Sequence, residues 1–236
     1  MRPRRPRERR RRRALASVRR VPRTEEGMTL VELLVAMSIL GVVLLVFTSV
    51  LASVQRGVVR QDSLSQTLDS ARLAIQQLDR ELRSGNVLYD PALENAAVGT
   101  PGRIASCTGC LPGYTLRVYT QTNADTRGPT PYRCVLWKIE NQQLMTRWWP
   151  PLEPGEATGW RTVAVGIVNR DLSPPTVAFV LDPDPLKGGR TLNVVYATNA
   201  DLQRHPTQTA KVQASLTGRN TSYGYPGNVC QSTPTG

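Results

Sequence analysis

Three sets of residues in this sequence have types and spacings that could support chemistry. Four cysteines could form disulfides or bind a metal ion: Cys107, Cys110, Cys134 and Cys230. His205 is the only histidine, so any Ser-His-Asp or Cys-His catalytic arrangement would depend on it. Glu32 is a single carboxylate beside a long apolar run, where a buried charge needs a cationic partner.

Catalytic motifs are absent from the sequence. His205 lies in the loop-like segment QRHPTQ, and nothing in the sequence places a nucleophile near it. Asp182 and Asp184, in the segment DPDP, could contact a cation, but a proline-rich turn explains them equally well. No phosphate-binding loop, metal-ligand pattern or cofactor motif is present. We therefore expect a protein that is not an enzyme and has no cofactor.

The cysteines favour structural disulfides over a metal site. The segment CTGC could be half of a zinc site or a redox motif. However, there is no second Cys-x-x-Cys pair, no histidine cluster and no thioredoxin-like βαβ context. An even number of cysteines outside the membrane indicates disulfides, and four cysteines allow three pairings. One disulfide could attach the polar C-terminal tail through Cys230.

The positive charge of the chain is concentrated at its N-terminus. Of a formal net charge of +12 over 236 residues, residues 1–27 hold twelve arginines against three glutamates, a balance of +9 that leaves +3 for the rest. Such a block can bind nucleic acid, but positive charge before a first membrane helix also keeps that flank in the cytoplasm. Beyond the apolar run the nearest charges are only Arg56 and Arg60. We expect the N-terminus in the cytoplasm, the rest outside, and no direct binding of nucleic acid.

The apolar run covers residues 33–54, twenty-two residues without a charge. A bilayer core needs about twenty helical residues, so the run is long enough to span it. It could be a permanent anchor, or a signal peptide cut after Ala52, although the apolar core of a signal peptide has only about 7–15 residues. The third possibility is a cut before the run.

The residues around Gly27 closely resemble the cleavage site of type IV prepilins and pseudopilins. In that family a membrane-embedded prepilin peptidase cuts after a glycine and N-methylates the residue that follows. An apolar residue, Thr, two aliphatic residues, Glu and a long apolar helix then follow in order, and residues 27–35, GMTLVELLV, match this pattern. Met28 replaces the usual Phe, and Glu25 and Glu26 stand where basic residues are more usual. The resemblance implies cleavage after Gly27 and N-methylation of Met28.

The same resemblance implies a role for Glu32 in subunit assembly. Cleavage leaves a positively charged amine on Met28, and subunits of such filaments stack their apolar helices in a central bundle. There Glu32 can pair with the amine of a neighbouring subunit, because an unpaired buried charge costs several kcal/mol. Two simpler alternatives remain open: Glu32 reaches the lipid headgroups, or it pairs with the Met28 amine of its own chain.

Two further elements must position these residues. After Val54 an apolar stripe continues with helical spacing, through Leu64, Leu68, Ala71, Ile75, Leu78 and Leu82. This stripe predicts an amphipathic second half of the helix, with a C-cap at Ser84–Asn86. Beyond it the sequence reads as short strands, at residues 114–120, 132–140, 143–149, 162–168, 176–182, 191–198 and 209–218. Asn141–Gln142 predicts a hairpin turn, and the last strand alternates polar and apolar residues, as in an antiparallel sheet with one solvated face.

This order of elements resembles PilW-type minor pilins and the J-type pseudopilin of type II secretion, more loosely than the leader resembles a prepilin. The resemblance implies an α+β fold, in which a long N-terminal helix packs on an antiparallel β-sheet head. We expect four segments: a leader removed by the peptidase (1–27), a transmembrane half-helix (28–54), an amphipathic half-helix (55–84), and a β-rich head with a polar tail (85–236).

The function implied is that of a minor pilin or pseudopilin in the bacterial cytoplasmic membrane and then in a filament. Its expected partners are the prepilin peptidase, other pilin or pseudopilin subunits, an inner-membrane assembly platform and the lipid bilayer. The filament could serve a type IV pilus, DNA uptake or type II protein secretion. Two alternatives are an anchored or secreted envelope protein with a ligand-binding head, in which the match at Gly27 is accidental, and a DNA-binding protein that uses the arginine-rich leader.

Overall fold

The computed structural model describes residues 27–97, 100, 104, 107–121, 132–184, 189–218 and 228–231. The leader predicted at residues 1–27 lies outside this range except for Gly27, and so does most of the polar tail after Gly218. The described chain is one long N-terminal helix with antiparallel sheets, so the predicted α+β class is confirmed. It divides into two compact units, Met1–Ser53 and Val54–Gly236.

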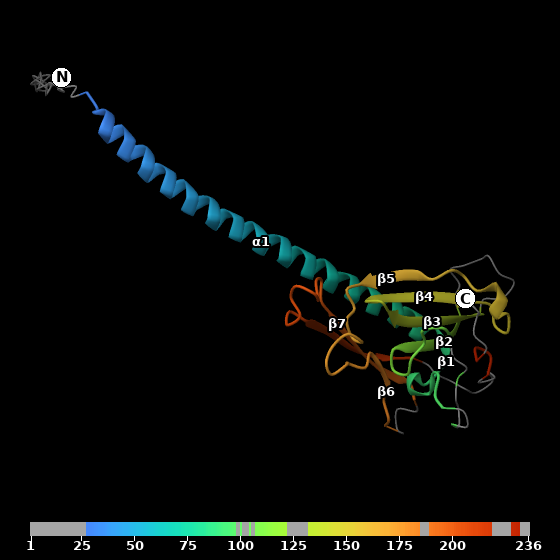
Figure 1. The fold of residues 1–236 in the computed structure, drawn as a ribbon. Coiled ribbons are helices and arrows are strands. Elements are labelled where there is room, and N and C mark those ends of the chain that lie inside the picture. The colour runs from blue at the N-terminus through green and yellow to red at the C-terminus, as the bar shows by residue number, and fades with distance from the viewer. Residues whose placement is uncertain are drawn as a thin grey trace, which may run out of the picture. The chain divides into compact units, whose positions relative to one another are not determined.

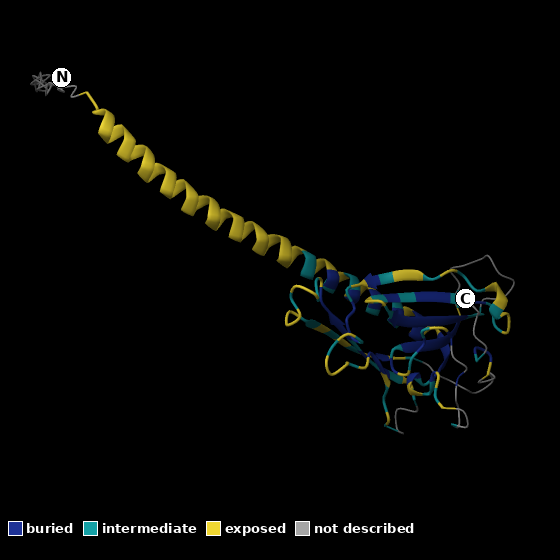
Figure 2. Ribbon diagram, viewed as in Figure 1, coloured by how far each residue is buried: buried dark blue, intermediate teal, exposed yellow. Residues whose placement is uncertain are grey.

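Helix α1 spans Leu30–Arg83, fifty-four residues without interruption. Every residue of α1 from Leu30 to Gln61 is exposed, as the yellow colour in Figure 2 shows. The helix ends where Ser84 turns back: its amide donates to the carbonyl of Arg80 at 3.2 Å, and its hydroxyl contacts the same oxygen at 3.0 Å. Capping of this kind satisfies carbonyls that have no partner within the helix.

In the second unit, α1 buries one narrow stripe of mostly small and apolar residues: Thr67, Ala71, Ala74, Leu78, Glu81 and Leu82. This differs in part from the predicted stripe, since Leu64, Leu68 and Ile75 are only half-buried. Ala71 and Ala74 lie at the centre and have no exposed surface, which lets the helix backbone approach the sheet closely. The face of α1 that contacts the sheet is therefore rotated toward Ala71 and Ala74 relative to the predicted stripe.

The central sheet has five antiparallel strands in the order β1-β2-β3-β4-β5 (Figure 1). Their bounds are β1 Gly85–Leu88, β2 Thr115–Gln121, β3 Tyr132–Glu140, β4 Gln143–Trp149 and β5 Arg161–Val165. The predicted hairpin between β3 and β4 is confirmed, and both Asn141 and Gln142 have positive φ angles, of 50° and 59°. Two central residues with positive φ fit the right-handed twist of the flanking strands.

A second sheet has three antiparallel strands in the order β6-β7-β8, with bounds Phe179–Leu181, Thr191–Thr198 and Ala210–Thr217. Two short 3-10 turns, η1 at Pro91–Leu93 and η2 at Pro154–Glu156, lie in the connections. Two predicted strands are shorter than expected. The strand predicted at 162–168 ends at Val165, because Gly166 has a φ of +71° and turns the chain. The strand predicted at 176–182 is only β6, which begins four residues after Pro175.

Two hydrophobic layers cover the two faces of the central sheet. The first packs α1 against the sheet, with Leu78, Trp137 and Leu144 fully buried at its centre. The second lies on the other face, around Trp149 and the cysteines. As a result β2 is buried on both faces, although Leu116 and Val118 alternate with polar residues in its sequence. β8 follows its prediction, because its residues alternate between more buried and exposed positions.

Candidate functional site

The peptide bond predicted to be cleaved lies just before the helix. Gly27, Met28 and Thr29 have no regular secondary structure, and α1 begins at Leu30. Met28 is 67% exposed, and a Cβ added at Gly27 would contact nothing within 4 Å. A peptidase needs an accessible bond outside regular secondary structure, and Gly27–Met28 meets this requirement.

Thr29 and Glu32 together form the N-terminal end of α1. The hydroxyl oxygen of Thr29 accepts a hydrogen bond from the amide of Glu32 at 3.3 Å, and its carbonyl accepts one from the amide of Leu33 at 3.1 Å. A threonine three residues before a glutamate is the sequence of a capping box, in which the threonine satisfies a free amide of the first turn. The prepilin-like motif at residues 27–35 therefore also contains the N-terminal cap of α1.

The Glu32 side chain has no partner among the residues that the structure describes. It is exposed, and no described donor or cation contacts its carboxylate. It is also the one ionisable residue between Leu30 and Val54. The positive ends of helix dipoles favour an acid in the first turn, which stabilises Glu32 where it lies but does not neutralise its charge.

Three other polar side chains of this helical segment, Ser38, Thr48 and Ser49, form hydrogen bonds with carbonyls of their own helix. The hydroxyl of Ser38 donates to the carbonyl of Leu34 at 2.8 Å, and that of Thr48 to the carbonyl of Leu44 at 2.9 Å. Hydroxyls bonded in this way can enter an apolar environment at low cost. A charged carboxylate cannot, so Glu32 is the residue in this segment that requires an external cation.

The helix is long and apolar enough to cross a membrane, by length and composition. Its most apolar stretch has a mean hydropathy of 2.8, and none of that stretch is buried within the chain. Large apolar surfaces left bare by a single chain mark a site of contact with lipid or with other protein. The first unit therefore presents an uncovered apolar rod with one carboxylate near its start.

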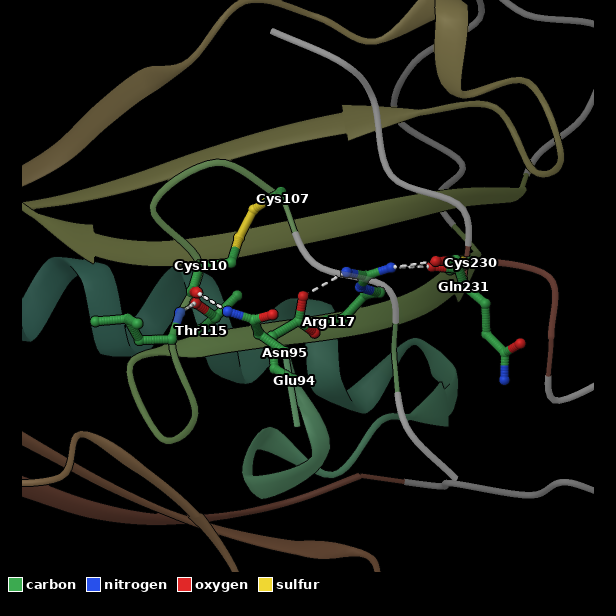
Figure 3. A network of polar contacts seen from close by, with 9 residues as sticks. Glu94, Asn95, Cys107, Cys110, Thr115, Arg117, Cys230 and Gln231 are labelled. Atoms are coloured by element: carbon green, nitrogen blue, oxygen red, sulfur yellow. Dashed lines mark hydrogen bonds and ion pairs between the residues drawn. A yellow bond between two sulfur atoms is a disulfide. The ribbon is translucent and has the colours of Figure 1, made fainter. Parts of the chain in front are cut away.

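The second layer of the head contains a buried ion pair between Arg117 of β2 and Glu94 (Figure 3). Their side chains are 0% and 1% exposed. The guanidinium of Arg117 also donates to the carbonyls of Cys230 and, at 3.0 Å, Gln231. Burial raises the pKa of Glu94 above its ordinary value and lowers that of Arg117, and each charge partly offsets the effect on the other. The pair therefore ties residues near the C-terminus to the sheet.

The structure pairs the cysteines as Cys107–Cys110 and Cys134–Cys230, with Cα–Cα distances of 5.2 and 5.6 Å. The second disulfide joins β3 to the segment 228–231, as expected for a tail held through Cys230. The phenol oxygen of Tyr89 accepts a hydrogen bond from the Cys230 amide at 3.0 Å. Glu94 lies near Cys107 and Cys110, but the two sulfurs bond to each other and the carboxylate pairs with Arg117, so the described groups act as structural contacts.

Among the described residues, no hydrogen bond joins the His205 imidazole to a nucleophile or a carboxylate. The His205 backbone amide donates to the carbonyl of Asp201 at 2.9 Å, so His205 lies in a turn. Asp182 and Asp184 also form a turn, in which the Asp182 carboxylate accepts from the Asp184 amide at 3.0 Å. This local hydrogen bond is typical of aspartate in turns.

Sequence reasoning missed Glu94 and Arg117. Arg117 alternates with Leu116 and Val118, a pattern that places it on the face opposite the helix and suggests solvent there. Only the second hydrophobic layer, formed by distant segments and the disulfides, covers that face. No local pattern in the sequence signals such a layer.

Comparison with known proteins gives one match. Residues 22–48 match the prokaryotic N-terminal methylation motif, a span that includes Gly27, Met28 and Glu32. No curated protein and no solved structure matches the chain. This motif is the N-terminal signature of type IV pilins and pseudopilins, and the long apolar helix with antiparallel sheets is consistent with a type IV pilin-like fold.

Proposed function

We propose that this protein is a minor pilin or pseudopilin, a structural and assembly subunit of a type IV pilus-like filament. The observation that carries the proposal is the isolated Glu32 carboxylate, close to the start of an exposed apolar helix within the methylation motif. The unprocessed chain offers this carboxylate no cation among its described residues. A neighbouring processed chain does.

The mechanism follows from charge and burial. Cleavage after Gly27 removes the arginine-rich leader and leaves a cationic amine on Met28, which is then N-methylated. When apolar helices stack, Glu32 of one subunit enters an apolar environment, and the Met28 amine of another supplies the opposite charge. A buried charge without a partner costs about 3–5 kcal/mol, so pairing favours helices placed in the register that joins the two groups.

The proposed location and partners follow from this mechanism. The chain enters the cytoplasmic membrane with its N-terminus in the cytoplasm, where the twelve leader arginines favour retention. It meets the prepilin peptidase there, and then other subunits and an inner-membrane assembly platform. The filament serves pilus biogenesis, DNA uptake or type II secretion. The minor role rests on the loose resemblance of the head and on its size.

The N-terminus of the mature protein tests the processing step. Mass spectrometry of membrane-extracted protein should find chains that begin with N-methylated Met28. Chains that begin at Ser53 would instead indicate a secreted protein, and full-length chains that retain DNA would indicate a nucleic-acid-binding leader. Either result would overturn the proposal.

Substitution of Glu32 tests the assembly step separately. We expect Glu32→Ala to be cleaved and methylated normally but to be lost from sheared filaments, because the Met28 amine of its neighbour has no counter-charge. Ser38→Ala is the matched control, since the Ser38 hydroxyl bonds only to its own helix. Normal incorporation of Glu32→Ala alongside Ser38→Ala would refute the pairing.

A further inference from the structure

A cleft of about 390 Å³ lies between the second half of α1 and the central sheet. Its wall combines Gln77 and Glu81 of α1 with Arg133, Thr146, Trp148 and Arg161 from β3, β4 and β5. The strand register explains why these groups meet. Trp148 pairs with Val135, and Thr146 pairs with Arg161, so their side chains share the face that α1 covers. The cleft lies outside the N-terminal segment on which the proposed function depends.

Arg133 is the half-buried cation of this cleft. Its Nε atom is buried and has no hydrogen-bond partner among the described residues. The guanidinium carbon lies 5.8 Å from the centre of the Trp148 ring, a cation–π contact that holds the group but uses none of its N–H donors. A buried guanidinium donor without an acceptor is costly, and a carboxylate is the acceptor whose shape matches it.

Arg161 supplies a second cation at the first residue of β5. Its side chain is exposed, and one terminal nitrogen donates to the side-chain oxygen of Gln77 at 3.0 Å. This bond holds the guanidinium at the mouth of the cleft and leaves its remaining donors available. The presence of Arg133 and Arg161 in one cleft favours an anionic ligand.

Glu81, the one acid among the described residues that line the cleft, does not form an ion pair with either arginine. Glu81 is 8% exposed, and one of its oxygens accepts from the indole N–H of Trp137 at 2.6 Å. Its other oxygen accepts from the Gln77 amide at 3.3 Å. No ion pair within 4.0 Å joins Glu81 to Arg133 or Arg161 among the described residues. Three arginines line the cleft, Arg133, Arg147 and Arg161, and against the one carboxylate they leave it with a net positive charge.

The neighbouring sheet edge indicates the form of the ligand. β5 is the last strand in the sheet order, so its outer edge has no strand partner in the described chain (Figure 1). The edge is also weakly protected, since Arg161, Thr162 and Val165 are exposed and Val165 is apolar. A free edge of this kind can accept an extended segment of another chain through backbone hydrogen bonds.

We propose that the cleft binds an aspartate or glutamate side chain of a second polypeptide, which pairs as an extended segment along β5. A residue of the added strand opposite Arg161 presents its side chain on the face of Arg161, toward the cleft. The carboxylate there accepts hydrogen bonds from Arg161, and Arg133 adds positive charge deeper in the same cleft. Backbone pairing provides affinity, and the two arginines select an acidic residue at that position.

The test is a binding measurement on the full-length protein in detergent, by fluorescence anisotropy. The probe is a short labelled peptide in which threonine and glutamate alternate. A peptide with glutamine in place of glutamate removes the charge, a peptide with proline in place of threonine prevents strand pairing, and free glutarate is a carboxylate without a backbone. We expect the glutamate peptide to bind, and each of the three controls to bind about tenfold more weakly or worse.

Variants of the cleft locate the binding. Arg133→Gln should weaken binding of the glutamate peptide by about tenfold, and Arg133→Lys by less, because lysine keeps the charge but loses the planar fork. Arg161→Glu reverses an exposed charge without disturbing the core and should abolish binding. Arg190→Gln is the matched control and should leave affinity unchanged, because Arg190 is an exposed arginine directly before β7 of the other sheet.

Four results would overturn the proposal. Equal binding of the glutamate and glutamine peptides would remove the role of charge. Equal binding of glutarate, or of the proline peptide, would remove the paired strand. Unchanged affinity in Arg161→Glu would place the site elsewhere.

Discussion

The buried pair of Arg117 and Glu94 permits a quantitative prediction for the head. Consider Arg117→Met, which keeps a long apolar side chain but removes the charge. The variant loses the guanidinium donors to Glu94, to the Cys230 carbonyl and to the Gln231 carbonyl. It also leaves the Glu94 carboxylate, 1% exposed, without a counter-ion.

The second consequence sets the magnitude. Removal of one partner from a buried ion pair costs about 3–5 kcal/mol, because the remaining charge is desolvated and uncompensated. We therefore expect the free energy of unfolding to fall by about 4 kcal/mol near neutral pH. In the variant Glu94→Gln, by contrast, Arg117 keeps its two carbonyl acceptors, and the loss should be smaller.

The pH dependence has a definite sign. Burial already raises the pKa of Glu94 above its ordinary value, and loss of the Arg117 charge raises it further. A carboxyl group with a raised pKa in the folded state stabilises the fold most below its unfolded pKa, and this contribution is lost as the pH rises through the folded pKa. The deficit of Arg117→Met should therefore be largest at neutral pH and shrink as the pH falls toward about 4.

The assay is urea unfolding of the full chain in detergent, followed by the fluorescence of Trp137 and Trp149, both fully buried in the head. The double variant Arg117→Met, Glu94→Gln closes the cycle. It should recover about 2 kcal/mol relative to Arg117→Met, because no charge remains buried. Losses that simply add, or a deficit that grows as the pH falls, would refute the reasoning.

Three further predictions concern the stability of the head, measured by the same unfolding assay. Replacing both Cys134 and Cys230 with Ser should cost about 4 kcal/mol, since that disulfide closes a sequence separation of 96 residues, and reduction of the native protein, which also breaks Cys107–Cys110, should cost at least as much. Leu78→Ala should cost about 2–5 kcal/mol because Leu78 is fully buried, while Leu73→Ala, at a residue 63% exposed on the same helix, should change stability by less than about 0.5 kcal/mol. Burial raises the pKa of Glu81, so the wild type should lose stability relative to Glu81→Gln as the pH rises from about 4 to neutrality; parallel pH profiles would contradict this.

Elements with strong local signals were predictable from the sequence. The uncharged run at 33–54 and the helical spacing after it predict one long helix, which the structure confirms. The β3–β4 hairpin was predictable because the polar step Asn141–Gln142 separates two apolar strands, and both residues tolerate a positive φ there. These features depend on residues close together in the chain.

Features that depend on distant partners were not predictable. β1 has only four residues, Gly85–Leu88, and its first residues resemble a helix cap; it is a strand because β2 pairs with it. The division into two sheets likewise depends on which strands meet. Ala74 lies in the contact between α1 and the sheet because its small side chain lets the helix backbone approach the sheet closely. The prediction followed the hydrophobic leucines of the helix and did not include this alanine. In the candidate site, Gly27, Met28 and Glu32 could be predicted because they belong to a local sequence motif. The role proposed for Arg133 could not, because it depends on a cleft formed by three strands and a helix.

The bond between Cys134 and Cys230 also has a bearing on when the head can mature. Ninety-six positions separate the two sulfurs along the chain, so ribosomal synthesis must proceed far beyond β3 before the second thiol exists. Oxidation requires a compartment outside the reducing cytosol. The layer that Cys230 closes is therefore completed only after both cysteines have been synthesised and have reached an oxidising compartment, so under the proposed topology the head crosses the membrane before this layer has formed.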